Sequence, residues 1–150
     1  MISIQRERYS DALCQELLPL LRDNWVRTES YISELEIDPA FKKYKKLDEM
    51  DMVTCITARR DGALVGYAIF FDNFSLHHQT VHTGHGDMIY VKDEAGLGRT
   101  AFRLLDAAEA HLRAKGVRYM GWFVRTGSRF YMILKSRGYV DDEIVMEKKL

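Results

Sequence analysis

The residues best suited to bind a ligand lie in one short turn in the second half of the chain. Gly96 and Gly98 flank Leu97, and Arg99 and Thr100 follow at once. Glycine lets backbone N–H groups come close to a ligand. The free amides and the dipole at a helix N-terminus favour phosphate. The turn therefore indicates a phosphate-binding site, although a plain connection between a strand and a helix would use the same residues.

Histidines and cysteines are the other residues that often carry chemistry. Four histidines lie within one short stretch, at His77, His78, His82 and His85. They have neither a paired cysteine nor a His-Glu-x-x-His helix beside them, so their spacing predicts no metal site. Cys14 and Cys55 are too few for a disulfide framework and favour a reducing compartment.

A strand and a long helix must hold the turn. Residues 88–91 (Met-Ile-Tyr-Val) are apolar or aromatic and favour a β-strand. The helix after the turn ends at Gly116. Apolar residues recur at helical spacing along one of its faces, at Ala101, Leu104, Leu105, Ala108 and Leu112. Residues 87–116 are therefore predicted to form one strand–turn–helix unit.

The remaining elements are expected to surround this unit. Ser10 caps a first helix, in which Pro19 should cause a kink or a restart. Asp38 and Pro39 open a second helix. The other expected elements are strands at 2–5, 52–58, 64–71, 117–124 and 139–149, a loop at 72–75, and a last helix at 129–137.

Composition excludes several classes of function. The 150 residues, 47% of them hydrophobic, suffice for one domain with a buried core, spanning 1–150. Twenty-two basic and twenty-two acidic side chains cancel, so no global field attracts nucleic acid or an anionic membrane. The sequence shows neither an apolar run that could span a bilayer nor the start of a signal peptide. We therefore expect a soluble, cytoplasmic protein without nucleic-acid or membrane partners.

The expected order of elements is β-α-α-β-β-β-α-β-α-β, which predicts an α/β fold with a mixed, mainly antiparallel sheet and helices on both faces. With the strand–turn–helix unit at its centre, this order resembles the GCN5-related N-acetyltransferase (GNAT) superfamily over nearly the whole chain. Four short motifs also resemble short phage-encoded GNAT proteins, namely Leu18-Pro19-Leu20-Leu21, Asp38-Pro39, Gly66-Tyr67-Ala68 and Arg137-Gly138-Tyr139.

The resemblance implies acetyl-CoA as the acyl donor. In the family, the amides of an Arg/Gln-x-x-Gly-x-Gly/Ala motif hold the pyrophosphate of acetyl-CoA. This motif is degenerate here: in one register only Ala101 matches, and in the other Asp93 stands where Arg or Gln is expected. The cofactor-binding residues that the resemblance implies are Ile89, Tyr90, Val91, Gly96, Leu97, Gly98, Arg99, Thr100 and Ala101.

Acyl transfer to an amine needs a base, because an ammonium group with a pKa near ~10 must lose a proton before it attacks. Asp87 is the expected base, since period-two alternation places it on the same strand face as Val91. Burial beside Met88 and Phe71 would raise its pKa toward a useful value. His85 shares the strand parity of Asp87 and is expected to relay its proton. A solvated carboxylate at a strand start is the alternative.

The leaving thiolate is commonly protonated in the family by a tyrosine of the last helix, four residues before its closing glycine. Leu134 occupies that position here, so Tyr131, one turn earlier, is the expected substitute. Simple packing of Tyr131 is the alternative, and release of the thiolate without an acid costs only about 2 kcal/mol. His77 and the acidic stretch from Glu29 to Asp38 are expected on the acceptor side, and a solvated connection between helices is the alternative for the acidic stretch.

These residues predict transfer of an acetyl group from acetyl-CoA to a primary amine of a small molecule or a protein, by direct attack in a ternary complex. The alternative is a catalytically weak or inactive CoA-binding or protein-interaction module. The degenerate motif and Leu134 favour that alternative, whereas Asp87 and the intact strand–turn–helix unit oppose it. The identity of the amine and the formation of a homodimer stay open.

Overall fold

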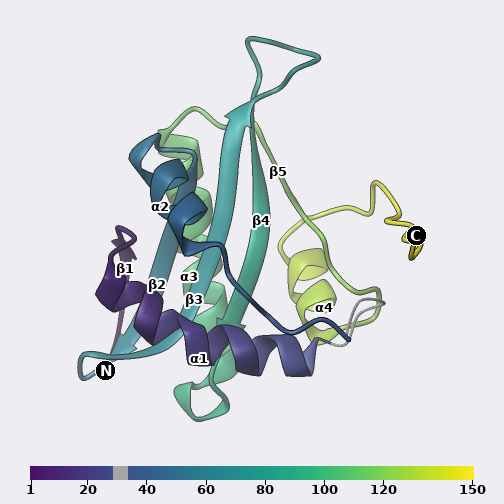
Figure 1. Ribbon diagram of the computed structural model, residues 1–150. Coiled ribbons are helices and arrows are strands. Elements are labelled where there is room, and N and C mark those ends of the chain that lie inside the picture. Colours follow the sequence, from purple (N-terminus) through teal and green to yellow (C-terminus); the bar gives the residue numbers. More distant parts are fainter. Residues whose placement is uncertain (29–33) are drawn as a thin grey trace.

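A computed structural model describes residues 1–28 and 34–150, and its strands form one five-stranded sheet in the order β1-β2-β3-β4-β5 (Figure 1). The strands are β1 (Ile2–Glu7), β2 (Val53–Arg60), β3 (Ala63–Phe74), β4 (His82–Val91) and β5 (Tyr119–Trp122). The first four strands pair antiparallel, and β4 pairs with β5 in parallel. The predicted mixed, mainly antiparallel sheet is therefore confirmed.

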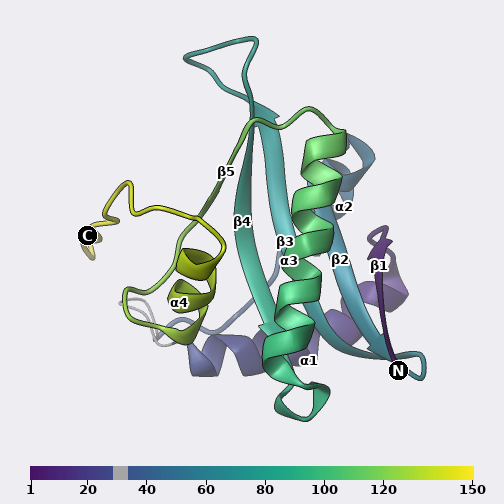
Figure 2. The same cartoon turned by 180° about the vertical axis from the view of Figure 1, so that it is seen from behind.

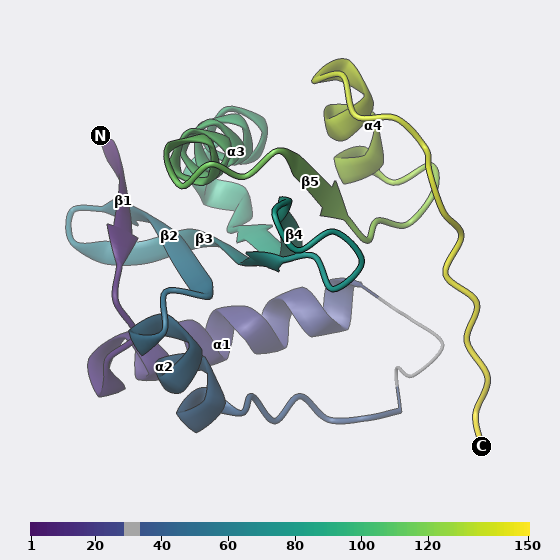
Figure 3. The same cartoon turned by 90° about the horizontal axis from the view of Figure 1, so that it is seen from above.

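Helices cover both faces of this sheet (Figure 3). One face carries α1 (Asp11–Arg27) and α2 (Phe41–Glu49), and the other carries α3 (Leu97–Ala114), with the short helix η1 (Asp93–Ala95) before it. Seen from behind, α3 lies along the sheet and α4 (Arg129–Ser136) stands beside β5 (Figure 2). This arrangement leaves α3 with its N-terminus next to the end of β4.

Two hydrophobic clusters hold the layers together. The cluster under α1 and α2 contains Leu17, Tyr67 and Ile69, each no more than 1% exposed. The cluster under α3 contains Phe70 and Leu104, which are completely buried. Residues 67, 69 and 70 alternate between the two clusters because successive side chains of a strand point to opposite faces. The buried cysteines of the sequence are free thiols.

Helix α1 runs without interruption through Pro19, so the predicted restart is wrong. Proline removes one hydrogen bond and costs about 3 kcal/mol inside a helix. Leu17, Leu20 and Leu21 are buried on either side of Pro19, and this packing offsets that cost. The Ser10 hydroxyl caps the helix by accepting the Leu13 N–H, as predicted.

The β3–β4 hairpin is longer than the sequence indicated. Strand β3 continues to Phe74, where a loop at 72–75 was predicted, and β4 already begins at His82. The loop was expected to begin at Asp72, because aspartate is uncommon in strands. Its side chain is instead only 2% exposed, and it is paired with Lys115 and His82.

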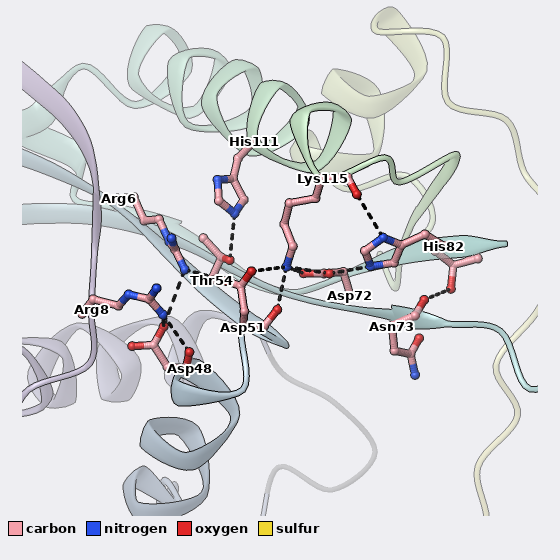
Figure 4. Close-up of polar contacts among 11 residues, drawn as sticks. Arg6, Arg8, Asp48, Asp51, Thr54, Asp72, Asn73, His82, His111 and Lys115 are labelled. Atoms are coloured by element: carbon pink, nitrogen blue, oxygen red, sulfur yellow. Dashed lines mark hydrogen bonds and ion pairs between the residues drawn. The ribbon is translucent and has the colours of Figure 1, made fainter. Parts of the chain in front are cut away.

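These charged groups belong to a polar network that fixes the C-terminal end of α3 to the sheet (Figure 4). Lys115 Nζ donates to Asp72 Oδ1 at 2.8 Å and to the Asp51 carbonyl at 2.6 Å. His82 Nε2 lies 2.7 Å from Asp72 Oδ2. On the other side of the network, Arg6 Nη2 donates to Asp51 Oδ1 at 2.9 Å. Strands β1, β3 and β4 are thereby linked to the end of α3.

The predicted strand at 139–149 is wrong, because the structure has no strand in that segment. The Tyr139 hydroxyl is anchored 3.1 Å from Glu109 of α3, and the chain beyond it runs away from the sheet (Figure 1). Val140 and Ile144 are 80% and 89% exposed. The adjacent carboxylates Asp141 and Asp142 interrupt the apolar alternation on which the prediction depended.

No helix in the described part of the chain is both long and apolar enough to cross a membrane.

Candidate active site

The edge of β4 that faces β5 is open over half its length. Strand β5 pairs only with residues Thr83 to Gly86 of β4. It is shorter than the strand predicted at 117–124, and it diverges from β4 toward α4 (Figure 1). The ladder between β4 and β5 therefore ends before Asp87. Among the described residues, the rest of β4 pairs with β3 alone.

The hydrogen-bond pattern identifies the backbone groups on this open edge. The Lys92 N–H donates to the Val65 carbonyl of β3 at 2.9 Å. In an antiparallel ladder, pairs of opposite residues that exchange hydrogen bonds alternate with pairs whose N–H and C=O groups point away from the partner strand. Tyr90, opposite Tyr67, therefore bonds to β3, whereas Ile89 and Val91 direct their N–H and C=O groups to the open edge. An extended ligand could add to β4 at this edge.

The open edge leads to the glycine turn. Gly96 adopts a left-handed conformation with φ 69° and precedes Leu97, the first residue of α3. The first intrahelical bond runs from the Thr100 N–H to the Gly96 carbonyl, at 3.1 Å. The amides of residues 97–99 therefore precede the hydrogen-bonded ladder of the helix and are available to an anion. Phosphate binding at this turn stays a prediction.

Arg129 is the cation that lies against this turn on the side of α4. Its Nη2 atom is 3.8 Å from the position that a Cβ at Gly98 would occupy. Arg99, the cation expected from the sequence, instead lines a cavity of about 330 Å³ together with Arg103 and Met1, at the start of β1. The two arginines therefore occupy different surroundings around the first turn of α3.

Asp93 ties the turn to the other face of the sheet. Arg27 Nη1, in the last turn of α1, donates to both carboxylate oxygens of Asp93 at 2.9 and 3.0 Å. Tyr90 donates its hydroxyl to Asp23 of the same helix. The acidic residue at a position where the family motif has Arg or Gln thus makes a local ion pair with α1.

Asp87 is the extra residue of a β-bulge. Met88 lies opposite Ile69 and Gly86 lies opposite Phe70, so Asp87 has no partner in β3. The bulge reverses the alternation. Asp87 consequently faces α2, whereas Val91 packs in the cluster under α3. The prediction that these two side chains share a face is therefore wrong.

The Asp87 carboxyl is exposed to solvent in part and contacts α2. Tyr44 donates its hydroxyl to Asp87 Oδ2 at 2.9 Å. Desolvation raises the pKa of Asp87 above its ordinary value, while the Tyr44 hydrogen bond and the nearby His85 act in the opposite direction. The net shift is upward, as the sequence predicted, and it brings this carboxyl closer to the range in which a base works at neutral pH.

His85 and Asp87 lie near each other on the side of the sheet that carries α2, as expected from their spacing. His85 packs edge-on against Phe123 with ring centroids 4.4 Å apart. His77, in contrast, is exposed in the loop beyond the strand ends, where its N–H donates to Ser75. Among the contacts of the described residues, none joins His77 to Asp87.

Tyr131 and Leu134 differ in their surroundings. Leu134, at the position of the family's tyrosine, is the buried residue of α4 and is 3% exposed. Tyr131 donates its hydroxyl to Asp141 Oδ2 at 3.0 Å, and the Lys135 Nζ lies 5.9 Å from its ring centroid. The hydrogen bond to Asp141 raises the pKa of Tyr131. The Tyr131 hydroxyl is thus hydrogen-bonded to the segment that follows α4.

The acidic stretch between α1 and α2 is described in part. Glu29 lies outside the described residues. Glu34 is paired with Lys149 at 2.8 Å, and Glu36 and Asp38 are exposed. The Trp25 indole N–H donates to the Leu35 carbonyl at 2.8 Å, which attaches this connection to α1.

Tyr44 and Arg129 are the two site residues that sequence reasoning did not find. In the sequence, Tyr44 follows the Asp38-Pro39 helix start and Arg129 opens the last expected helix, and neither stands in a motif. Each reaches the site from an element distant in sequence, so neither spacing nor motif could reveal the contact. No group of three or more potential metal ligands occurs in the described part of the chain.

The sequence matches the family model described as "Acetyltransferase (GNAT) family" over residues 11–133. No curated protein sequence matches the chain. Several solved structures share its fold at low identity. The ribosomal-protein-alanine N-acetyltransferase of Brucella melitensis biovar Abortus 2308 is 20% identical, with a TM-score of 0.72 and 100% of both chains covered.

Two further structures bear the names of aminoglycoside acetyltransferases. One, from an uncultured soil metagenomic sample, is 13% identical with a TM-score of 0.76, covering 100% of this chain and 98% of that one. The other was solved in complex with CoA, and it is 14% identical with a TM-score of 0.72, covering 100% of this chain and 95% of that one. At these identities the likeness is one of fold.

Proposed function

Because the chain belongs to the acetyltransferase (GNAT) family, we propose that it transfers the acetyl group of acetyl-CoA to a primary amine by direct attack in a ternary complex. The observation that carries this proposal is the open edge of β4. It begins beside a carboxylate at Asp87 and ends at the amides of the α3 turn. Donor and acceptor would meet across this edge.

The donor is proposed to lie along the open edge. The backbone groups of Ile89 and Val91 would pair with the extended pantetheine arm, and one of their N–H groups would stabilise the oxyanion of the tetrahedral intermediate. The amides of residues 97–99 would hold the pyrophosphate. Arg129, beside Gly98, would supply the positive charge that the degenerate motif lacks.

Asp87 is proposed to be the base. Its carboxylate takes a proton from the acceptor ammonium, directly or through a water molecule. The free amine nitrogen then attacks the thioester carbonyl carbon, the C–S bond breaks, and CoA leaves as a thiolate. Because a thiol has a pKa near ~8.5, release of CoA as a thiolate at neutral pH costs little free energy. Protonation of that thiolate by Tyr131, and proton relay through His85, stay predictions.

The acceptor is proposed to enter from the side of α2, to which Asp87 points. A negative carboxylate and exposed Glu36 and Asp38 would favour a cationic amine. The printed names of structural neighbours, a ribosomal-protein-alanine N-acetyltransferase and aminoglycoside acetyltransferases, suggest a protein N-terminus and an aminosugar as the first amines to test.

Calorimetry and mass spectrometry test this proposal in turn. We expect acetyl-CoA to bind the purified protein, and labelled acetyl-CoA to mark one class of amine in a panel of peptides, polyamines and aminosugars. Absence of binding at high micromolar acetyl-CoA would contradict the proposed donor site. Binding without transfer to any amine of the panel or of a cell lysate would favour a protein that binds CoA without turnover.

A further inference from the structure

Asp87 is held by a side chain that comes from a separate element. We propose that Tyr44 of α2 is a positioning residue, which orients the Asp87 carboxylate and thereby couples the acceptor-side helix to the base. This inference rests on the proposed function, in which Asp87 removes the acceptor proton. It adds a residue that neither the sequence motifs nor the cofactor site includes.

The geometry of Tyr44 suits this role. Its ring stacks on Tyr9 with centroids 5.4 Å apart, and it lies 5.9 Å from the ring of Phe71. Both neighbours belong to, or pack against, the core cluster under α1 and α2. The phenol therefore has a fixed direction, and its hydroxyl reaches Asp87 Oδ2 at 2.9 Å.

The hydrogen bond selects one oxygen of the carboxylate. Asp87 occupies a bulge, where the ladder of β3 and β4 does not constrain it. The Tyr44 hydroxyl engages Oδ2, so Oδ1 is the oxygen left to receive a proton from the amine. A base whose orientation is fixed in this way loses less entropy when the acceptor arrives.

The electrostatics agree with a donor role for Tyr44. Burial and the Asp87 carboxylate raise the pKa of Tyr44, so its hydroxyl stays protonated at all working pH values. The bond favours the charged form of Asp87 and opposes the effect of burial. The other titratable groups around the pair are His85 of β4, Tyr67 of β3 and Tyr9.

The test is a pH profile of kcat/KM for the acceptor in Tyr44→Phe. This variant keeps the stacked ring and removes only the hydroxyl. Without that bond the pKa of Asp87 rises further, so the acidic limb of the profile should move to higher pH. At neutral pH we expect kcat/KM to fall about tenfold. The KM for acetyl-CoA should not change, and activity should recover at alkaline pH.

Tyr9→Phe is the matched control. Its hydroxyl is buried without a hydrogen-bond partner among the described residues, although its ring stacks on the same face of Tyr44. The control should keep the wild-type pH profile. A Tyr44→Phe profile that superimposes on that of the wild type, or that is lowered equally at every pH, would overturn the inference.

Asp87→Asn separates this inference from the proposed function. If Asp87→Asn is inactive at neutral pH while Tyr44→Phe matches the wild type, only the role of Tyr44 is overturned. If Asp87→Asn keeps full activity, the proposed base is wrong, and the positioning role of Tyr44 is overturned with it.

Discussion

At the scale of single residues, two arginines lie near the first turn of α3, where the glycine motif is degenerate. Arg129 approaches Gly98 from α4, whereas Arg99 faces the cavity at the start of β1. A guanidinium group can bind two oxygens of a pyrophosphate at once. Arg129 reaches Gly98 from a separate helix, and we therefore propose it as the arginine that binds the pyrophosphate.

We predict that Arg129→Ala weakens acetyl-CoA binding about tenfold, the usual magnitude for the loss of one charge-assisted hydrogen bond. Calorimetry with acetyl-CoA and with acetyl-pantetheine, which lacks the pyrophosphate, provides the measurement. Affinity for acetyl-pantetheine should be the same in both proteins. Arg99→Ala serves as the comparison, and an equal or larger loss in that variant would contradict the assignment of the pyrophosphate to Arg129.

The sequence was informative about individual groups and uninformative about their mutual contacts. Asp87 and the turn could be found because each stands beside a recognisable apolar pattern. The direction of Asp87 could not be found, since the extra residue of a bulge reverses alternation without any mark in the sequence. Tyr44 resembles any aromatic residue on the apolar face of a helix, and only the folded chain brings it to Asp87.

At the scale of elements, the divergence of β4 and β5 depends on one glycine. A Cβ at Gly86 would lie 2.0 Å from Trp122 Cε3, so the indole packs directly on the bare backbone. Trp122 in turn contacts Phe130 of α4 edge-on, with centroids 5.2 Å apart. This contact joins the end of β5 to α4, the helix that carries Arg129.

We predict that Gly86→Ala lowers the stability of the fold by roughly 1–3 kcal/mol, because the indole must move to admit the methyl group. Acetyl-CoA affinity should fall as well, since α4 moves with Trp122. Thermal unfolding and calorimetry measure the two effects. Gly121→Ala in β5 is the matched control, because its Cβ would have only ordinary contact, at 4.0 Å from His85 Nδ1. Equal stability of the two variants would contradict this role for Gly86.

Elements with a continuous apolar pattern were predictable, and those defined by tertiary contacts were not. Helix α3 follows its helical periodicity, and strand β2 lies close to its predicted bounds of 52–58. Asp72 lies inside β3 because the Lys115 ammonium and the His82 ring contact its carboxylate there, which is not visible in the sequence. The expected strand at 139–149 does not form, because Asp141 and Asp142 interrupt its apolar alternation.

At the scale of the whole molecule, the network around Asp72 holds the sheet and α3 together at the end remote from the glycine turn (Figure 4). The carboxylate is almost fully buried, and the Lys115 ammonium is 16% exposed. Removing one partner of such a pair is costly, because it leaves the other charge buried without compensation.

We predict that Lys115→Met destabilises the protein by about 3 kcal/mol. Denaturant unfolding gives the value. Arg113→Met, on the same helix, removes an exposed arginine whose one ion pair among the described residues is with Glu109 in the preceding turn, at 3.4 Å. It should cost less than about 0.5 kcal/mol. In the double variant Asp72→Asn, Lys115→Met, stability should partly recover. A loss in Lys115→Met as small as that of Arg113→Met would show that the network does not hold the fold.

The pH dependence of Asp87→Asn tests the catalytic role of this carboxyl most directly. The control is Asp61→Asn, in a turn residue whose φ of 51° asparagine also adopts. Because the pKa of Asp87 is raised, the wild type should lose kcat/KM as the pH falls and this base becomes protonated. Asp87→Asn should lower kcat/KM about 100-fold or more at neutral pH and move the optimum upward, toward the pKa of the amine itself, with unchanged acetyl-CoA affinity. Wild-type rates and an unaltered pH profile in Asp87→Asn would contradict a role for this carboxyl as the base.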